Sequence, residues 1–298
     1  MSNNRTVDPP VPPVHPTGLL AEKTAIVTGG GTGLGKGIAI ELAREGAHVV
    51  VASRQREHLE VGLREIEEHG GSGSLQTVDI RDADAVERLV ATVVQDHGGL
   101  DILVNNAAGN FVCPAEDYSP NGWRTIVDIV LNGTFLCSWA AGRYWIEAQR
   151  SGSIINVVST HVYSGCPGLA ASAASKAAVT NLTQTLAVEW GAHGIRVNGI
   201  APGVFPNPTV QAQMHPEEGG MDGARQRAAR TVPLGRAGEP WELGRAAVYL
   251  CSDDATYITG HTLVVDGGNW LRRGHLMPEY KTVPEQMAER ELSRRAGH

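Results

Sequence analysis

Seven short segments rich in Val, Ile and Ala alternate along the chain with longer segments of helical periodicity. Most of the short segments are continuously apolar, as strands buried on both faces of a sheet should be. We expect strands at 25–28, 48–52, 74–79, 102–105, 154–158, 196–200 and 262–265. We expect helices at about 33–45, 55–69, 83–97, 120–149, 170–191 and 240–251. This alternation predicts an α/β fold in which about seven parallel strands carry helices on both faces.

A glycine-rich turn, TGGGTGLGKG at Thr28–Gly37, joins the first expected strand to the first helix. Gly29 permits a tight turn, while Gly33 and Gly35 let the backbone approach a pyrophosphate closely. The start of the helix supplies N–H donors and a favourable dipole to the phosphates. We therefore predict a single Rossmann-type, doubly wound sheet that binds a dinucleotide; a purely structural glycine turn is the alternative. The predicted contacts in this turn are Gly29, Thr32, Gly33, Leu34 and Gly35.

The end of the second strand selects between NAD and NADP. Sites for NAD usually place an acidic residue there to hold the ribose hydroxyls. Here Ser53 and Arg54 occupy that corner. Because an arginine can pair bidentately with a 2′-phosphate, we predict NADPH as the cofactor. The alternative is that Arg54 is a solvated surface charge.

Two further strand ends contribute to the same site. Asp79, at the end of the third strand, is placed to accept a hydrogen bond from the adenine amino group. The motif NNAAG at Asn105–Gly109 ends the fourth strand, and its small residues, including Ala107, let the adenine ribose lie close to the backbone. Ligands of open α/β sheets gather at the carboxyl ends of the strands, so we expect these motifs to converge on one crevice.

Composition and charge exclude several other kinds of protein. The 298 residues carry a net charge of −7 and no run of basic residues, which argues against nucleic acid as the main partner. The four cysteines show no CxxC pairing, so we expect neither a metal site nor a disulfide framework. The N-terminus lacks the apolar stretch of a signal peptide, and no window of 18 apolar residues predicts a membrane span. A cytoplasmic protein with reduced thiols is expected.

Three segments lie outside the regular alternation of strands and helices: the two ends of the chain and one stretch within the domain. Residues 1–18 are Pro-rich and are expected to form an extended arm, and residues 271–298 are expected to form a charged tail. Residues 19–270, between them, are expected to form the catalytic domain. Within the domain, residues at about 203–236 are rich in Pro, Gly and Arg and follow a strand end, so we expect a lid over the site.

The motifs together resemble the short-chain dehydrogenase/reductase family over nearly the whole chain. The matching motifs are TGGGTGLG, NNAAG, Ser159 with Lys176, Pro202–Gly203 and the DGG at Asp266–Gly268. In that family a serine, a tyrosine and a lysine reduce a carbonyl group, and the tyrosine lies four residues before the lysine. In this chain Ser172 occupies the tyrosine position. The resemblance also adds Lys176, Pro202, Gly203 and Val204 to the predicted cofactor contacts.

Longer runs point to one branch of the family. NNAAGNF, YSPNGW, DIVLNGT and the Ser172–Lys176 pair are similar to the 2,4-dienoyl-CoA reductases, whereas NLTQTLAVEWG and APGV are also similar to the trans-2-enoyl-CoA reductases. The resemblance implies reduction of a carbon–carbon double bond of an unsaturated fatty acyl-CoA, a step of fatty acid β-oxidation, in a homotetramer. A non-catalytic NADP-binding module that has lost its proton donor is the alternative of a different class.

The missing tyrosine fits double-bond reduction better than carbonyl reduction. Carbonyl reduction makes an alkoxide that needs a proton at once. Hydride addition to a carbon–carbon bond conjugated to a thioester instead collects charge on the thioester oxygen, and a preorganised hydrogen-bond donor can hold that enolate. The first candidate donor is Asn132, which the resemblance places on the thioester oxygen; the alternative is that Asn132 only shapes its helix.

A second donor is expected near the end of the fifth strand. The resemblance implies a tyrosine fifteen residues before the lysine, and that position is His161. A neutral histidine can donate a hydrogen bond, and a charged one can also protonate the enolate. Tyr163 takes this role if the loop is shifted, and a third possibility is that neither residue does.

Ser172 and Lys176 are four residues apart and share one helix face. The resemblance implies that Lys176 holds the nicotinamide ribose hydroxyls, and its charge favours the enolate. Ser172 either relays a proton or contacts substrate, or it makes room for the acyl chain. Ser159 either anchors the thioester or caps a loop. Arg81, Phe111 and Tyr163 are the candidate contacts to the acyl-CoA, with Arg81 and the lid arginines offered to its phosphates, although each arginine can equally be a solvated charge.

Overall fold

The structure is a computed structural model that describes residues 18–207 and 220–271, together with residues 285, 287–289 and 291–292. The expected N-terminal arm, apart from Gly18, and most of the expected tail lie outside the described residues. So do residues 208–219 of the expected lid. The fold is therefore built from the expected catalytic domain alone.

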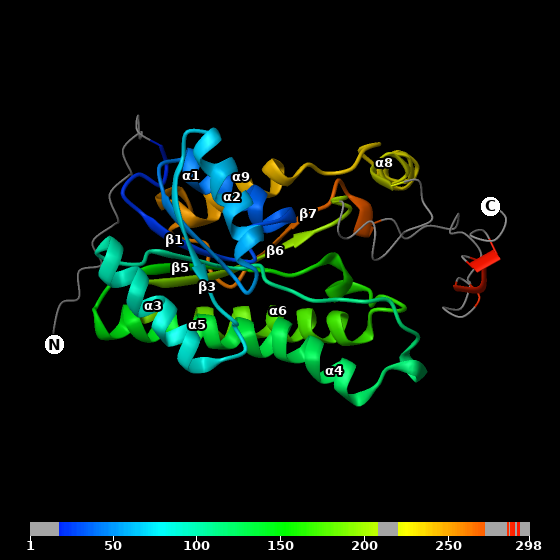
Figure 1. Ribbon diagram of the computed structural model, residues 1–298, viewed down its shortest axis with the longest axis horizontal. Helices are drawn as coiled ribbons and strands as arrows, with labels where there is room; N and C mark the ends of the chain where they lie inside the picture. Colours follow the sequence, from blue (N-terminus) through cyan, green and yellow to red (C-terminus); the bar gives the residue numbers. More distant parts are fainter. Residues whose placement is uncertain (1–17, 208–219, 272–284, 286, 290, 293–298) are drawn as a thin grey trace, which may run out of the picture.

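A sheet of seven parallel strands forms the centre of the molecule, as the sequence predicts (Figure 1). The strands are β1 Thr24–Thr28, β2 His48–Ser53, β3 Ser72–Thr77, β4 Ile102–Asn105, β5 Gly152–Val157, β6 Ile195–Pro202 and β7 Thr262–Val265. Their order in the sheet is β3-β2-β1-β4-β5-β6-β7. The chain therefore reverses its direction of winding between β1 and β4, and a crevice opens outside the carboxyl ends of neighbouring strands at such a point.

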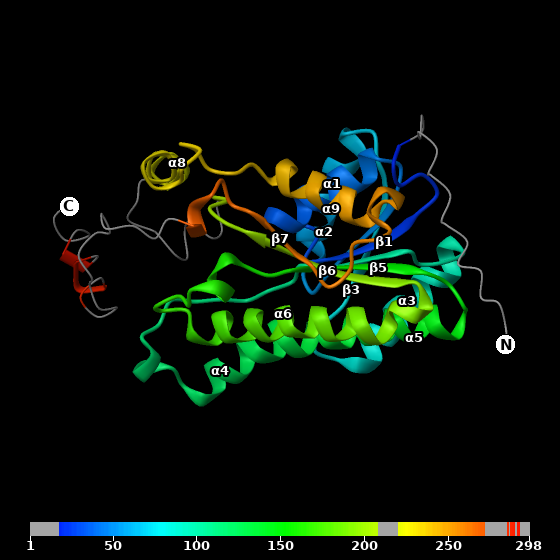
Figure 2. The same cartoon turned by 180° about the vertical axis from the view of Figure 1, so that it is seen from behind.

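Helices cover both faces of the sheet (Figures 1 and 2). The helices α1 (Gly33–Arg44), α2 (Arg56–Glu68) and α9 (Pro240–Cys251) pack on one face, and α3 (Ala83–His97), α5 (Gly133–Glu147) and α6 (Ala170–Trp190) pack on the other. Each face has its own apolar core. Trp145 of α5 is fully buried in one of them, where its indole N–H donates to the Leu100 carbonyl at 2.7 Å.

Two short segments depart from the expected boundaries. Strand β3 ends at Thr77 rather than at Asp79, so Asp79 lies in the loop beyond the strand. The expected helix at 120–149 consists of α4 (Pro120–Val127), a π-helical turn at Asp128–Asn132, and α5. A π-helical turn contains one residue more than an α-helical turn. The side chains on either side of it therefore point in directions that a regular helical period does not predict.

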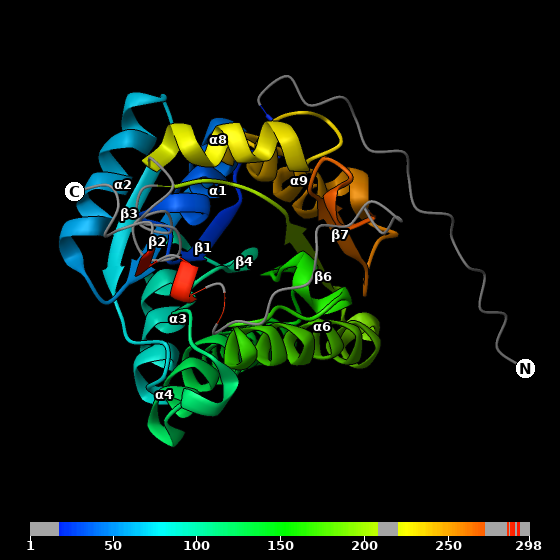
Figure 3. The ribbon, with the colours of Figure 1, turned by 90° about the vertical axis from the view of Figure 1, so that its right-hand side faces the viewer.

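The expected lid contains a helix, α8 (Gly220–Thr231), which lies on the same side of the sheet as α1 and α9 (Figure 3). Its Ala, Arg, Gln and Met residues favour helix strongly, which the abundance of Gly and Pro around it obscured. Ala224 and Ala228 face inward and are fully buried. Short side chains on the inner face let the helix lie close to the body of the protein.

Among the described residues, one helical stretch is long and apolar enough to cross a membrane by length and composition. It is Pro120–Glu147, with a mean hydropathy of 1.3 over 18 residues, and half of that window is buried inside the protein. Its buried face packs against α3 and α6. A core helix of a folded domain meets the same criteria, so this stretch is weak evidence for a span.

Candidate active site

A cavity of about 520 Å³ lies at the carboxyl ends of β1, β2 and β4. Residues from the glycine-rich turn and from the loops after β2, β3 and β4 line it, so the structure brings together motifs that lie up to about 80 residues apart in the sequence. The predicted cofactor residues that line it are Gly29, Thr32, Gly33, Leu34, Ser53, Arg54, Asp79 and Ala107.

The glycine-rich turn forms a cradle that no larger residue could form. A Cβ atom on Gly35 would lie 2.3 Å from the Asn106 amide nitrogen and 2.3 Å from the Gly29 carbonyl oxygen. Gly29 has a φ of 64°, in the left-handed region that L-residues avoid. Because the backbone is bare here, its N–H groups and the start of α1 are open to a phosphate. The residues present therefore fit a dinucleotide.

Two neighbouring asparagines at the end of β4 have different roles. Asn105 is predicted as a cofactor contact, but its side chain is buried, and its amide donates to Ser138 and to Asn156, each at 2.9 Å. Asn106 donates to the carbonyl oxygens of Thr28 and Gly29 and lines the crevice. Successive side chains of a strand point to opposite faces, so only one of the two can face the crevice. The Asn105 side chain therefore has a structural role, and a cofactor contact through the Asn105 backbone stays a prediction.

A cluster of charges lies at the corner of the crevice formed by β2 and β3. Ser53 and Thr77 are register partners, and the Val78 N–H donates to the Ser53 carbonyl at 2.9 Å, so Arg54 and Asp79 lie on adjacent chain segments. Asp79 accepts hydrogen bonds from the Arg81 side chain at 2.5 to 3.1 Å. These bonds are the main reason that the pKa of Asp79 is lowered, so the carboxylate is charged at neutral pH.

Lys176 projects from α6 toward the end of β5. Its side chain is buried, and its ammonium donates a hydrogen bond to the Val157 carbonyl. Burial disfavours the charged form and lowers the pKa of Lys176 to about 8. A buried ammonium with a single described partner is costly to hold, and such groups are concentrated at functional sites. The role of Lys176 beside the cofactor stays a prediction.

Ser159, His161 and Tyr163 lie in and just before a 3-10 turn that packs against α6. The Ser159 hydroxyl accepts the His161 N–H at 3.3 Å and so caps this turn, which was one of the two roles considered for it. Partial burial lowers the pKa of His161, which therefore favours the neutral imidazole at pH 7. A neutral imidazole can donate one hydrogen bond.

Tyr163 is 37% exposed, and its ring packs against Trp270 with centroids 4.9 Å apart. This contact ties the 3-10 turn to the segment after β7. Ser172 lies one turn before Lys176 on α6 and is half-buried, so a small hydroxyl occupies the tyrosine position. The choice between His161 and Tyr163 as hydrogen-bond donor stays a prediction.

Asn132 belongs to the π-helical turn that packs against α6, and Ile129 of the same turn lines the crevice. Asn132 is exposed, and its amide donates to the Asp128 carboxylate at 2.8 Å on the surface of the helix. The π-helical turn sets the direction of the side chains around it, because it contains an extra residue. Val130, two residues earlier, is fully buried against Ala171 of α6 instead. The role of Asn132 as an oxyanion donor stays a prediction.

Asn110 is a crevice-lining amide that the sequence analysis did not single out. Its side-chain oxygen accepts the Phe111 N–H at 3.0 Å, which leaves the amide nitrogen to donate. Phe111 is 40% exposed, and its ring stacks on Tyr118 with centroids 5.0 Å apart. Asn110 lies in the quoted run NNAAGNF, so its place five residues after the end of β4 was the available signal.

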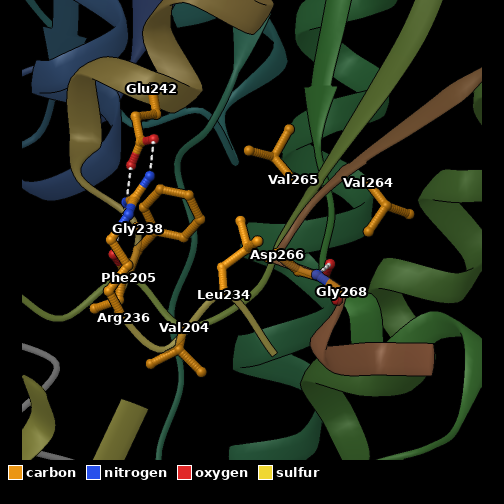
Figure 4. A pocket seen from close by; sticks show the side chains of 12 residues that line it. Val204, Phe205, Leu234, Arg236, Gly238, Glu242, Val264, Val265, Asp266 and Gly268 are labelled. Atoms are coloured by element: carbon orange, nitrogen blue, oxygen red, sulfur yellow. Dashed lines mark hydrogen bonds and ion pairs between the residues drawn. The ribbon is translucent and has the colours of Figure 1, made fainter. Parts of the chain in front are cut away.

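A second cavity, of about 240 Å³, lies between the ends of β6 and β7 and the segment that follows α8 (Figure 4). The side chain of Val204, predicted as a cofactor contact, lines this cavity. The Arg236 guanidinium holds both carboxylate oxygens of Glu242 at 2.7 Å, and Asp266 accepts the N–H groups of Gly268 and Trp270. These charged groups are therefore already paired within the protein.

The ends of β6 and β7 lie against each other at Gly203, where a Cβ atom would lie 2.4 Å from the Asp266 Cβ. Pro202 ends β6 in register with Val265. The chain then crosses to the glycine-rich turn, because the Asn207 amide nitrogen lies 3.6 Å from a Cβ built on Gly33. Asn207 lines the main crevice, so the first residues of the expected lid do border the site.

The described residues include no group of three or more His, Cys, Asp or Glu side chains placed to hold a metal ion. All four cysteines are free thiols, and Cys137 and Cys251 are buried. The site thus consists of a glycine-lined crevice, a buried lysine and a set of neutral hydrogen-bond donors.

The sequence matches a family model described as enoyl-(acyl carrier protein) reductase over residues 29–269. A probable 2,4-dienoyl-CoA reductase of Bacillus subtilis, (2E)-enoyl-CoA-producing, is 44% identical over 85% of this chain and 98% of the relative. A peroxisomal 2,4-dienoyl-CoA reductase of Arabidopsis thaliana, (3E)-enoyl-CoA-producing, is 37% identical over 86% of this chain and 87% of the relative.

A solved structure of a short chain dehydrogenase from Bacillus anthracis has 46% sequence identity and a TM-score of 0.75. The match covers 86% of this chain and 99% of that one. The motifs, the strand order and these relatives agree with one another. The chain belongs to the short-chain dehydrogenase/reductase family.

Proposed function

We propose that this protein uses NADPH to reduce a carbon–carbon double bond of an unsaturated fatty acyl-CoA, as a 2,4-dienoyl-CoA reductase. The observation that carries this proposal is the pair on α6. Lys176 is retained and buried, while Ser172 stands where carbonyl-reducing members hold a tyrosine. The similarity to 2,4-dienoyl-CoA reductases from two organisms supports the same substrate class.

The family uses a nicotinamide cofactor, which supplies a hydride when it is bound. The glycine-rich turn and the start of α1 would hold its pyrophosphate, and the Lys176 ammonium would hold the ribose hydroxyls next to the nicotinamide. Ser53 and Arg54 would hold the 2′-phosphate that distinguishes NADPH from NADH. Asp79 would accept a hydrogen bond from the adenine amino group.

The substrate half of the site has to hold negative charge on the thioester oxygen. Asn110 replaces Asn132 as the first donor in this proposal, because its amide nitrogen is left free to donate and it lines the crevice. His161 is the second donor. Its lowered pKa favours the neutral form, which donates a hydrogen bond without adding a buried charge. Each preorganised donor of this kind typically lowers a barrier by about 3 kcal/mol.

Lys176 contributes charge as well as position. Its ammonium is buried at the end of β5, where the dielectric is low and a developing enolate is stabilised more strongly than in water. The final proton has to come from a group other than the missing tyrosine. We propose that His161 takes up a proton from solvent and passes it to the enolate.

A second candidate function is reduction of a trans-2-enoyl-CoA. The observation that favours it is the description of the matching family model, which is an enoyl-(acyl carrier protein) reductase. Both reactions pass through an enolate of the thioester and need the same donors. They differ in where the hydride arrives, because a dienoyl chain extends the conjugation by two carbon atoms.

The direct test offers the purified protein NADPH together with a 2,4-dienoyl-CoA, a trans-2-enoyl-CoA or a simple ketone, and follows the absorbance of the reduced nicotinamide. The proposal expects the fastest oxidation with the dienoyl-CoA and little with the ketone. Faster ketone reduction would contradict it. Tight NADPH binding without turnover of any acyl-CoA would identify a non-catalytic binding module. Proton magnetic resonance of the product then locates the remaining double bond.

We also propose that the protein works as a homo-oligomer, in keeping with the tetramer that the family resemblance implies. Helices α5 and α6 each expose a large apolar side chain, since Phe135 is 45% exposed and Val188 is 84% exposed. Burial of such side chains in an assembly would remove apolar surface from water. Analytical ultracentrifugation of the full chain measures the assembly, and replacement of Phe135 by Ser should shift it toward smaller species.

A further inference from the structure

We propose that Arg81 sets the preference for NADPH over NADH by neutralising Asp79, and that it does so without touching the cofactor. This inference rests on the proposed function, because it assumes that the crevice binds a nicotinamide dinucleotide. It assigns Arg81 a positioning role that differs from the acyl-CoA contact expected from the sequence.

The first step is the geometry of the ion pair. The Arg81 Nε lies 2.9 and 3.1 Å from the two Asp79 carboxylate oxygens, and its Nη2 lies 2.5 Å from one of them. The Arg81 backbone N–H donates to the same carboxylate at 3.1 Å. Three hydrogen bonds hold the guanidinium side-on against Asp79, and the backbone N–H of the same residue adds a fourth.

The second step is the position of this pair relative to the crevice. Asp79 and Arg54 both line the crevice, whereas Arg81 is not among the residues described as lining it. The Arg81 side chain is directed at the Asp79 carboxylate, which itself lines the crevice. A guanidinium in this position can influence a phosphate through its charge, and it does not need to form a hydrogen bond to it.

The third step is the charge balance at the corner. A 2′-phosphate carries about two negative charges, and Arg54 is the cation beside it in the crevice. Without Arg81, the Asp79 carboxylate would cancel the charge of Arg54 and repel the phosphate. With Arg81, the three side chains together keep one net positive charge. NADH carries no 2′-phosphate, so its binding is much less sensitive to this balance.

Other charged groups near Asp79 and Arg81 do not reverse the net positive charge at this corner of the crevice. Asp128 of the π-helical turn acts on Arg81 from its outer side and raises the pKa of the guanidinium further. Asp82 caps α3 through the Ala85 N–H and is engaged there. Glu57 lies in the first turn of α2, next to the exposed Arg56–Glu60 pair. The carboxylate that lines the crevice at this corner is Asp79.

The test measures dissociation constants of NADPH and NADH, by quenching of protein fluorescence, for the wild type, Arg81→Gln, Asp79→Asn and the double variant. Arg81→Gln should weaken NADPH binding roughly five- to tenfold and NADH binding less than about twofold at low salt. Adding Asp79→Asn should restore NADPH binding to within about twofold of the wild type, because the uncompensated charge is removed. Arg81→Lys, which keeps the charge, should stay close to the wild type.

Arg143→Gln is the matched control, since Arg143 is an exposed arginine on α5 that is paired with Glu87 at 3.0 Å, away from the crevice. It should change neither constant. Equal weakening of both cofactors by Arg81→Gln, or no rescue by Asp79→Asn, would overturn the inference in favour of a structural role. Unchanged cofactor binding with a raised KM for acyl-CoA would overturn it in favour of a substrate contact.

The same measurements separate this inference from the proposed function. The ratio of the two constants in the wild type tests the NADPH assignment, and a preference for NADH would reject that assignment whatever the variants do. The change of the ratio between the wild type and Arg81→Gln tests Arg81. If the wild type prefers NADPH and Arg81→Gln has the same ratio of dissociation constants, the role of Arg81 is rejected and the NADPH assignment stands.

Discussion

The two halves of the crevice are built from different parts of the polypeptide. The cofactor half is formed by main chain, since Gly29 and Gly35 leave no room for a side chain and Asn106 is bonded to the backbone beside them. The substrate half is formed by side chains, among them Asn110 on the loop after β4, His161 in the 3-10 turn and the half-buried Ser172 on α6. Where the backbone itself forms the site, only glycine fits at certain positions. Where side chains form it, a hydrogen-bond donor can come from any of several positions in the sequence.

Lys176 lies where the two halves meet, and its replacement should have the largest effect on activity. Lys176→Met removes the group that would hold the cofactor ribose and stabilise the enolate. We expect kcat/KM for the dienoyl-CoA to fall by about 1,000-fold. Steady-state kinetics measure this loss. A variant that keeps more than a tenth of the activity would show that the two halves work independently of the lysine.

The same variant should be more stable than the wild type. Burial lowers the pKa of Lys176 from 10.5 to about 8, a shift that costs about 3 kcal/mol of folding free energy at pH 7. Loss of the bond to Val157 offsets part of this gain, so we expect the free energy of unfolding to rise by about 1–2 kcal/mol. Urea denaturation monitored by circular dichroism measures it.

The pH dependence of that stability difference has a definite sign. Below pH 8 the folded protein carries the buried charge, and between pH 8 and 10.5 the unfolded chain is the more protonated state. Stability of the wild type therefore rises relative to Lys176→Met across this range. The difference between the two proteins should be largest below pH 8 and should shrink as the pH approaches 10.5. A constant difference would contradict the assignment of the cost to the buried ammonium.

In the cofactor half, a single methyl group should be damaging. Gly35→Ala places a Cβ 2.3 Å from two fixed atoms, so the turn has to shift. We expect NADPH binding to weaken by about 100-fold, which corresponds to about 3 kcal/mol, or the protein to lose a similar amount of stability. Calorimetric titration and thermal unfolding separate these two outcomes.

Gly191→Ala is the control for Gly35→Ala. Gly191 follows α6 with a φ of −57°, and a Cβ there meets nothing within 4 Å. The variant should bind NADPH as the wild type does. If Gly35→Ala also binds NADPH as the wild type does, the cofactor half tolerates a side chain at this position. The proposed difference between the two halves would then be wrong.

In the substrate half, two asparagines test which amide acts. Asn110→Ala should lower kcat by roughly 30- to 100-fold, because it removes a donor to the enolate. Asn132→Ala should change kcat less than about twofold, because that amide is bonded to Asp128 at the surface. Binding of NADPH should change in neither variant. A large loss in Asn132→Ala alone would mean that the π-helical turn rearranges when substrate binds.

The smallest effect is expected from the loop after β5. His161→Ala should lower kcat by about tenfold, whereas Tyr163→Phe should leave it within about threefold, because the Tyr163 ring packs against Trp270 in either case. Parallel kinetics on the two variants decide between the donors. Unchanged turnover in both would remove this loop from the chemistry and leave Asn110 as the donor.

Prediction from the sequence succeeded where residue type and periodicity carry the information. The seven strands and their parallel arrangement follow from apolar runs, and the structure has them as expected. Eight of the residues predicted to contact the cofactor line one crevice, and their contact with a cofactor stays a prediction. The errors have specific causes. Asn105 and Asn106 are adjacent and chemically identical, and the direction of the strand decides which of them faces the crevice. The interruption of the expected helix at 120–149 was missed because a π-helical turn has no periodic signal of its own.

The sequence by itself determined the family, the sheet and the glycine cradle, because each depends on local constraints of the backbone that only certain residues satisfy. It also showed that Ser172 stands in place of a tyrosine. Tertiary structure decided which side chains share the crevice and in which ionisation state. The pairing of Arg81 with Asp79, the burial of Lys176 and the orientation of Asn110 arise from contacts between segments far apart in the chain or from the path of a loop. No local pattern encodes such contacts, since they depend on how the finished sheet brings its strand ends together.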